Sequence, residues 1–131
     1  MQDMQEAMRW TNEKNLFMAY NGIRVVAMEN DWSQVVLDVV ENSKNVWGMV
    51  HGGVYYTMAD CAAGAAARSM GGSYVTLSGN LNFLKSVTEG RITAEAHKVH
   101  RGRTTCVYRV ELKDDAGNLL AEGNFTMFRL K

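Results

Sequence analysis

Residues 51 to 68 read HGGVYYTMADCAAGAAAR, and this stretch decides how the rest of the chain must be arranged. Alanine and other good helix formers dominate it, and Gly71 and Gly72 follow, so it predicts a helix over residues 51–68. A helix on the surface of a protein has a polar face, and this one has none. We therefore expect a central helix that other elements cover.

The segments on either side of this helix predict what covers it. Before it, the chain predicts an N-terminal helix over residues 1–20 and two short strands, 23–28 and 34–40. After it, everything reads as sheet, because β-branched and aromatic residues alternate with polar ones. These strands are expected in residues 73–85, 91–100, 103–114 and 119–130. The pattern predicts an α+β fold in which an antiparallel sheet packs on one helix.

Length and composition narrow the class of protein. A chain of 131 residues predicts a single domain, 1–131, which buries roughly two thirds of its unfolded surface. Lys plus Arg and Asp plus Glu both number 14, so net charge points to neither nucleic acid nor a membrane surface. No apolar run reaches the ~18 residues of a membrane span, and the N-terminus lacks a signal-peptide core. We expect a cytoplasmic protein with reduced thiols at Cys61 and Cys106.

Asp60 is the one carboxylate within the expected central helix. Its neighbours on the helix surface are Tyr56, Thr57, Ala63 and Gly64, none of which carries a charge. Burial of an ionised carboxylate is costly unless the group is paired or its pKa rises. Asp60 is therefore either a catalytic group or a residue that caps a break or points to solvent.

The start of the same helix favours the catalytic explanation. His51, Gly52 and Gly53 leave backbone N–H groups bare at a helix N-terminus, where developing negative charge is stabilised. Gly52 and Asp60 are eight residues apart, roughly 12 Å along a helix axis, so they cannot serve one carbonyl group together. Two helices related by a two-fold axis would pair the start of one with Asp60 of the other. The spacing predicts a dimer with two shared sites.

Three motifs of the sequence together resemble those of a known family. The motif N-x-x-G-x-V-H-G-G (45–53), Asp60 at the ninth position after His51, and RGRT (101–104) resemble hotdog-fold thioesterases of the phenylacetic-acid-degradation (PaaI-like) type. This superfamily includes 4-hydroxybenzoyl-CoA thioesterases and medium- and long-chain acyl-CoA thioesterases. The similarity runs from about Phe17 onward. It implies a hotdog fold, hydrolysis of an acyl-CoA, a homodimer with shared active sites, and a dimer of dimers, that is, a homotetramer.

The resemblance also implies roles for the residues around the thioester. The Gly52 N–H would polarise the carbonyl, and Asp60 of the other subunit would act as general base or as nucleophile. The Asn45 amide would hold the carbonyl or the water. His51 would donate near the same oxygen, or it is simply a satisfied loop histidine. Thr76 matches a family hydroxyl that positions water.

Further residues are candidates for contact with the acyl and coenzyme A parts of the substrate. Ser78 and Phe83 would border the acyl or pantetheine channel. Two arginines around a glycine suit the phosphates of coenzyme A, although such a run is also common at charged strand junctions. The family carries a similar segment at the nucleotide end. The candidates there are His100, Arg101, Gly102, Arg103 and Thr104.

Other classes of protein fit the sequence less well. Hotdog hydratases use an Asp-x4-His pair, and no aspartate precedes any of the three histidines at that spacing. A non-catalytic protein that binds or senses acyl-CoA or an acyl carrier would keep RGRT but would not need Asp60. Dispersed histidines and cysteines predict no metal site, and Cys61 projects about 100° away from Asp60 on a helix. We expect no cofactor, since coenzyme A is part of the substrate.

Overall fold

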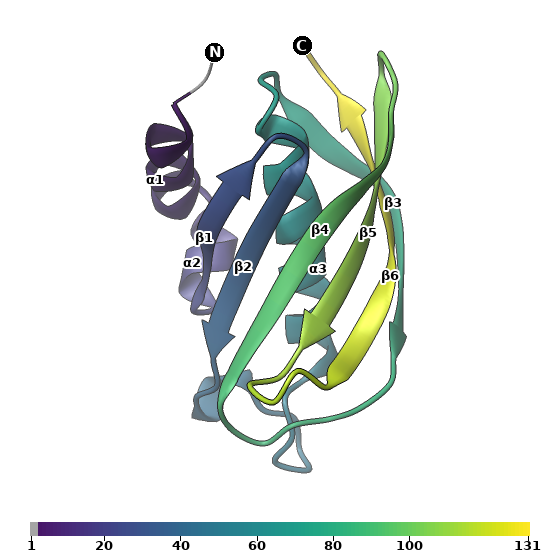
Figure 1. The fold of residues 1–131 in the computed structure, drawn as a ribbon. Coiled ribbons are helices and arrows are strands. Elements are labelled where there is room, and N and C mark those ends of the chain that lie inside the picture. Colours follow the sequence, from purple (N-terminus) through teal and green to yellow (C-terminus); the bar gives the residue numbers. More distant parts are fainter. Residues whose placement is uncertain (1–2) are drawn as a thin grey trace.

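In the computed structural model, which describes residues 3–131, a six-stranded antiparallel sheet curls around one long helix, α3 (Gly52–Arg68) (Figure 1). The strands are β1 (Ile23–Glu29), β2 (Trp32–Asp38), β3 (Tyr74–Phe83), β4 (Arg91–Arg101), β5 (Thr105–Lys113) and β6 (Leu119–Arg129). Their order across the sheet is β1-β2-β4-β5-β6-β3, which leaves β1 and β3 at the edges. The predicted α+β architecture is confirmed.

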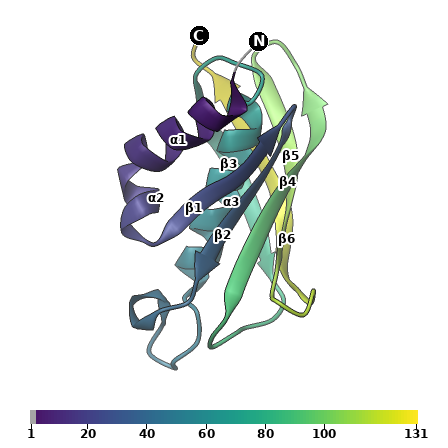
Figure 2. The ribbon, with the colours of Figure 1, turned by 60° about the vertical axis from the view of Figure 1, so that its left-hand side comes forward.

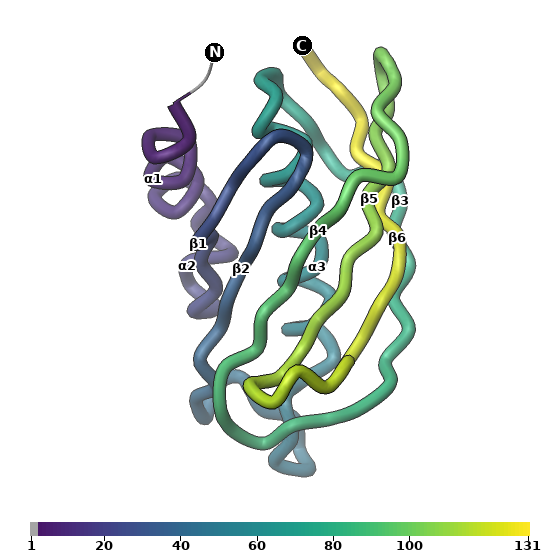
Figure 3. Tube along the Cα trace, in the orientation of Figure 1, coloured from purple at the N-terminus to yellow at the C-terminus, as the bar shows by residue number. Residues whose placement is uncertain are grey.

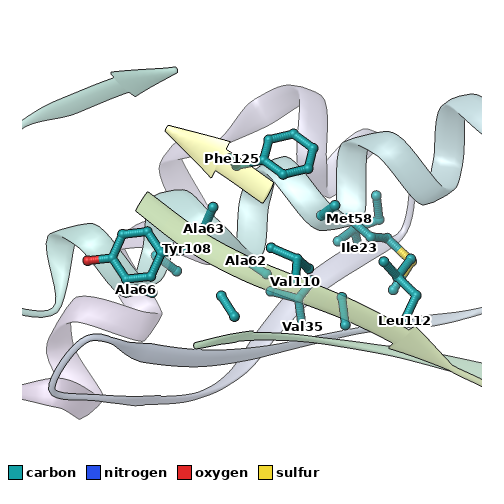
Figure 4. Close-up of a cluster of buried hydrophobic side chains, with 14 of the residues drawn as sticks. Ile23, Val35, Met58, Ala62, Ala63, Ala66, Tyr108, Val110, Leu112 and Phe125 are labelled. Atoms are coloured by element: carbon teal, nitrogen blue, oxygen red, sulfur yellow. The ribbon is translucent and has the colours of Figure 1, made fainter. Parts of the chain in front are cut away.

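The core lies between the concave face of the sheet and α3. Alternate residues of β5, from Cys106 to Leu112, are fully buried, and Ile92, Ala94 and Ala96 of β4 are buried in the same way. The predicted alternation is thus confirmed. Figure 4 shows strand side chains meeting small residues of α3, whose alanines allow the sheet to approach the helix closely.

The N-terminal segment departs from the sequence prediction. In place of one helix over 1–20, the structure has α1 (Met4–Lys14) and α2 (Leu16–Tyr20), and residues 1 and 2 lie outside the described part. Asn15 separates them because its backbone leaves the helical region and its side chain accepts the N–H of Met18 (3.4 Å). Both helices pack beside β1, next to α3 (Figure 2).

The two ends of α3 meet different sets of loops. At its start lie the loop from β2 to α3, the β3–β4 connection and the β5–β6 hairpin (Figure 3). At its end lie the β1–β2 turn, the β4–β5 turn and the end of β6 (Figures 1 and 3). Candidate residues of the sequence are therefore divided between opposite ends of the molecule. Among residues 3–131, no helix combines the length and apolar character that a membrane span requires.

Candidate active site

The start of α3 presents one unpaired backbone N–H. His51 is the N-cap, and its Nδ1 accepts the N–H of Gly53 (2.8 Å), while the N–H of Val54 donates to the His51 carbonyl (2.9 Å). Gly52 is the first residue of the helix, and its N–H has no acceptor within the described chain. Because Nδ1 of His51 accepts, a neutral ring carries its proton on Nε2, where it can serve as a donor.

Asn45 shapes the loop that leads into this helix. Its Oδ1 accepts the N–H groups of Trp47 (2.9 Å) and Met49 (3.2 Å), and its own N–H donates to the Met49 carbonyl (2.7 Å). The side-chain oxygen is therefore used within the loop, and the amide NH2 is the group left for a ligand. A hollow of about 270 Å³ lies beside His51 and Gly53.

Phe83 lies against the start of α3. A Cβ on Gly52 would sit 3.4 Å from Cε1 of Phe83, and the Phe83 ring stacks on Tyr55 at 6.2 Å between centroids. The Tyr55 hydroxyl donates to the Lys85 carbonyl (3.0 Å), which ties the end of β3 to the helix. An aromatic ring thus lies beside Gly52, and the expected role of Phe83 at a substrate channel stays a prediction.

Asp60 lies two turns further along α3, where it meets Thr76 of β3. The Thr76 hydroxyl donates a hydrogen bond to Oδ1 of Asp60. Asp60 is only partly buried, and its second oxygen makes no hydrogen bond within residues 3–131. The structure brings Thr76 and Asp60 into contact, and the expected role of Thr76 in positioning water stays a prediction. A carboxylate with one oxygen fixed and one free can accept a proton or attack a carbonyl.

The neighbouring thiol is unsuited to nucleophilic chemistry. Burial, followed by the charge of Asp60, raises the pKa of Cys61 to about 12. Its Sγ contacts Nδ2 of Asn15 at 3.9 Å. Both cysteines are free thiols, as expected. No cluster of three or more His, Cys, Asp or Glu side chains suited to a metal ion occurs in residues 3–131.

Arg101 requires a correction, because the structure turns its guanidinium inward. Its nitrogens donate to Oδ1 of Asp31 (2.8 Å), to the hydroxyls of Tyr74 (2.8 Å) and Tyr108 (3.0 Å), and to the carbonyl of Ala67 (2.9 Å). Asp31 is buried, which by itself would raise its pKa, but these hydrogen bonds and charges lower the pKa overall. Arg101 therefore holds the end of α3 to the sheet and is not free to bind phosphate.

The rest of the RGRT segment forms the turn between β4 and β5. The Gly102 N–H donates to the Thr105 carbonyl (2.8 Å), and a Cβ there would meet that oxygen at 3.0 Å, so this backbone is not open to a ligand. His100, Arg103 and Thr104 are exposed. They lie at the end of α3 and not at its start, so within one chain they are distant from Gly52 (Figure 1).

Ser78 also requires a correction. A β-bulge at Leu77 shifts the register, so Thr76 pairs with Met127, whereas Ser78 pairs with Thr126. Met127 faces the core and Thr126 does not, so Thr76 points toward α3 and Ser78 points to the outer face of the sheet. Simple alternation along the strand could not predict this inversion.

Arg68 is a residue that the sequence interpretation missed. It lies on the face of α3 that carries Asp60, at two further steps of four residues, and that spacing was the available signal. With residues of α1 it lines a cavity of about 660 Å³ beside the end of α3.

Comparison with known proteins bears on this arrangement. A family model described as "Thioesterase superfamily" matches residues 48–121, which include Asp60 and Thr76. The 1,4-dihydroxy-2-naphthoyl-CoA hydrolase of Listeria monocytogenes is 33% identical over 109 residues, which cover 81% of this chain and 89% of that protein.

Two solved structures show the same fold. A point variant of the phenylacetic acid degradation protein PaaI from Thermus thermophilus has a TM-score of 0.82 at 32% identity, covering 88% of this chain and 99% of its own. A hypothetical thioesterase from Streptococcus pneumoniae, solved with coenzyme A, has a TM-score of 0.82 at 31% identity. The match covers 90% of this chain and 95% of that protein. The expected hotdog fold is confirmed.

Proposed function

Because this chain belongs to the thioesterase superfamily, we propose that it is an acyl-CoA thioesterase in which Asp60 is the catalytic carboxylate. The observation that carries the proposal is the hydrogen bond from Thr76, which fixes one oxygen of Asp60 and leaves the other without a hydrogen bond in residues 3–131. Hydrolysis consumes one water and yields the free acid and the thiol of coenzyme A.

Each site requires two subunits, because Asp60 and the bare Gly52 N–H lie roughly 12 Å apart along one helix. The edge strand β3 supplies the interface: its backbone is unpaired on one side, and Val75 and Leu77 are 45% and 61% exposed. If two β3 strands pair antiparallel about an axis between Gly79 and Asn80, Thr76 comes near the partner's Phe83. The start of the partner's α3 then faces Asp60.

In this site the Gly52 N–H stabilises the oxyanion that develops on the thioester carbonyl, and Nε2 of His51 donates beside it. Oδ2 of Asp60 either removes a proton from the attacking water or itself attacks the carbonyl carbon and expels the thiolate. In the second route water then cleaves the resulting anhydride. The exposed Arg103 remains the candidate for the coenzyme A phosphates, and the dimer of dimers stays a prediction.

The test is the Asp60→Asn variant, assayed by thiol release from aryl- and alkyl-CoA thioesters. We expect kcat to fall by at least ~100-fold, because the amide can neither accept the proton nor attack. The matched control is Cys61→Ala on the next residue of the helix, which should keep activity within a few-fold. Near-normal turnover by a folded Asp60→Asn dimer would exclude the proposed role of Asp60.

The two chemical routes give different isotope patterns in a single turnover in ¹⁸O-labelled water. General-base catalysis places the label in the acid product. Water attack on the Asp60 carbon of an anhydride places it in the Asp60 carboxylate, which mass spectrometry of the peptide detects. Tight binding of acyl-CoA without turnover of any thioester by the wild type would instead favour a binding or sensing protein.

A further inference from the structure

A cavity of about 660 Å³ lies between α1 and the end of α3, and the proposed catalytic mechanism gives it no role. Trp10 and Thr11 of α1 form one wall, and Arg68 of α3 and Tyr74 of β3 form another. Asn15 also lines it, and Asn15 contacts Cys61, the residue next to Asp60. One residue of the cavity wall therefore contacts the turn of α3 that carries Asp60.

Arg68 places a cation inside this cavity. Its side chain folds back over Gly64, where a Cβ would meet Nη1 at 3.2 Å, so glycine at this position leaves room for the guanidinium. Its side-chain hydrogen bond goes to the hydroxyl of Thr11 (3.3 Å). It makes no salt bridge within residues 3–131, although the charge of Asp60 acts on it and opposes the lowering of its pKa. Burial lowers the pKa of Arg68, although the group stays charged.

The other charged residues that line the cavity are exposed. Glu6 and Lys14 of α1 are exposed, and so is Asp3, the N-cap before α1, whose Oδ1 accepts the N–H of Gln5 (3.0 Å). Arg68 is less exposed than these residues and belongs to the catalytic helix. Among the charged residues that line the cavity, Arg68 is therefore the one that is partly buried.

The distance from Asp60 limits what this ligand can be. The guanidinium lies over Gly64, one helical turn from Asp60, or roughly 6 Å along the axis. A thioester carbonyl held beside Asp60 would leave room for a short acyl group before its far end reached Arg68. An unpaired, partly buried guanidinium favours a carboxylate there, because its planar fork binds both oxygens.

We propose that this cavity takes the acyl group of the substrate and that Arg68 binds a carboxylate at its far end. The substrate class is then the mono-CoA thioester of a short dicarboxylic acid. This inference rests on the proposed function, since it takes the thioester to lie at Asp60. Hydrolysis of such a substrate releases the dicarboxylate and coenzyme A, with one water consumed.

The wild-type protein gives the first test. Initial rates of thiol release are measured for glutaryl-CoA against pentanoyl-CoA and for adipoyl-CoA against hexanoyl-CoA, with spontaneous hydrolysis subtracted. Each pair has the same chain length and differs in the terminal carboxylate. We expect kcat/KM to be at least about tenfold higher for a carboxylate-ended substrate. Equal or lower values for both would overturn the proposal.

The second test assigns the preference to Arg68. Arg68→Met keeps an unbranched, flexible side chain and removes the charge, so the ratio of kcat/KM for glutaryl-CoA to kcat/KM for pentanoyl-CoA should fall to about one. The matched control, Lys14→Met, removes an exposed cation of the same cavity and should keep the preference. Survival of the preference in Arg68→Met would refute the assignment. If Arg68→Met does not fold, Arg68→Gln, which can still bond to Thr11, gives the same comparison.

These experiments distinguish failure of the proposed substrate class from failure of the proposed thioesterase function. Hydrolysis of the uncharged thioesters that is lost in Asp60→Asn, without a preference for carboxylates, would leave the proposed thioesterase standing and refute the role of Arg68. Absence of hydrolysis of any thioester would reject the thioesterase itself.

Discussion

At the scale of single residues, two arginines that the sequence presents as a pair have different roles. Arg101 gives its donors to Asp31, two tyrosine hydroxyls and the carbonyl of Ala67, whereas the side chain of Arg103 is exposed on the same turn. Asp31 has a positive φ of 57° at the β1–β2 turn, and Arg101 neutralises its buried charge. One arginine therefore serves the fold, and the other remains available to a ligand.

Arg101→Ala should destabilise the protein by about 3 kcal/mol, because it removes the nearer cation of the buried Asp31 carboxylate and leaves only Lys98 at 3.9 Å. Arg103→Ala should change the free energy of unfolding by less than about 0.5 kcal/mol, yet raise KM for a CoA thioester. Urea unfolding and steady-state kinetics on the two variants measure both quantities. Similar stability losses in both would contradict the division of roles.

The pH dependence of stability tests the ion pair between Asp31 and Arg101. The pKa of Asp31 in the folded protein lies below its ordinary value. The ion pair therefore contributes its full stabilisation at a pH above the pKa of Asp31 in the unfolded chain. This stabilisation is lost as the pH falls through the lower pKa of the folded protein. The difference in unfolding free energy between wild type and Arg101→Ala should narrow as the pH drops below about 4. A difference that stays constant down to acid pH would rule out the ion pair as its cause.

At the scale of elements, the contact between β3 and β6 positions Thr76 beside Asp60. The bulge at Leu77 turns Thr76 toward α3, and the strand continues beside β6 with Gly123 opposite Leu81. A Cβ on Gly123 would lie 2.0 Å from the carbonyl oxygen of Asn80, so the two strands need glycine there. The edge strand that is proposed to form the dimer thus depends on a residue in its neighbour.

Gly123→Ala should therefore destabilise the protein by about 2 kcal/mol or more, because backbone of β3 must move to admit the methyl group. Thermal unfolding followed by circular dichroism measures the effect. The control is Thr126→Ala on the same strand. The Thr126 side chain faces away from the core, so its removal should change the melting temperature little. An unchanged melting temperature in Gly123→Ala would contradict the close strand approach.

At the scale of the whole molecule, a shared site can be tested by mixing two inactive variants. Gly52→Pro removes the proposed oxyanion donor with little strain, because proline suits the first position of a helix. His51 before it already has the extended backbone (φ −67°, ψ 138°) that precedes proline. Each homodimer, Gly52→Pro or Asp60→Asn, should be nearly inactive.

Refolded together, the two variants should recover about one quarter of wild-type activity, since random pairing makes about half the dimers mixed and each has one intact site. The control is that Gly52→Pro alone folds and dimerises, which circular dichroism and gel filtration establish. Recovery of no activity by well-folded mixtures would exclude a site shared in this way.

The sequence by itself determined the central helix and the strands, and it predicted the two groups that are proposed to form the site. Helix propensity and the lack of a polar face predicted α3, and period-two alternation predicted the strands, because both patterns reflect burial along a local segment. Asp60 and the Gly52 N–H were predicted as separate halves of a site because eight residues of helix have a fixed length.

Only the tertiary structure decided which side chains face the site. The bulge at Leu77 turns Ser78 outward, Asp31 draws Arg101 inward from a distant turn, and Arg68 folds over Gly64 into a cavity closed by α1. Each outcome depends on contacts between segments far apart in the chain. Local propensity and spacing carry no information about such contacts, because the charge or the space that directs a side chain is supplied by another element.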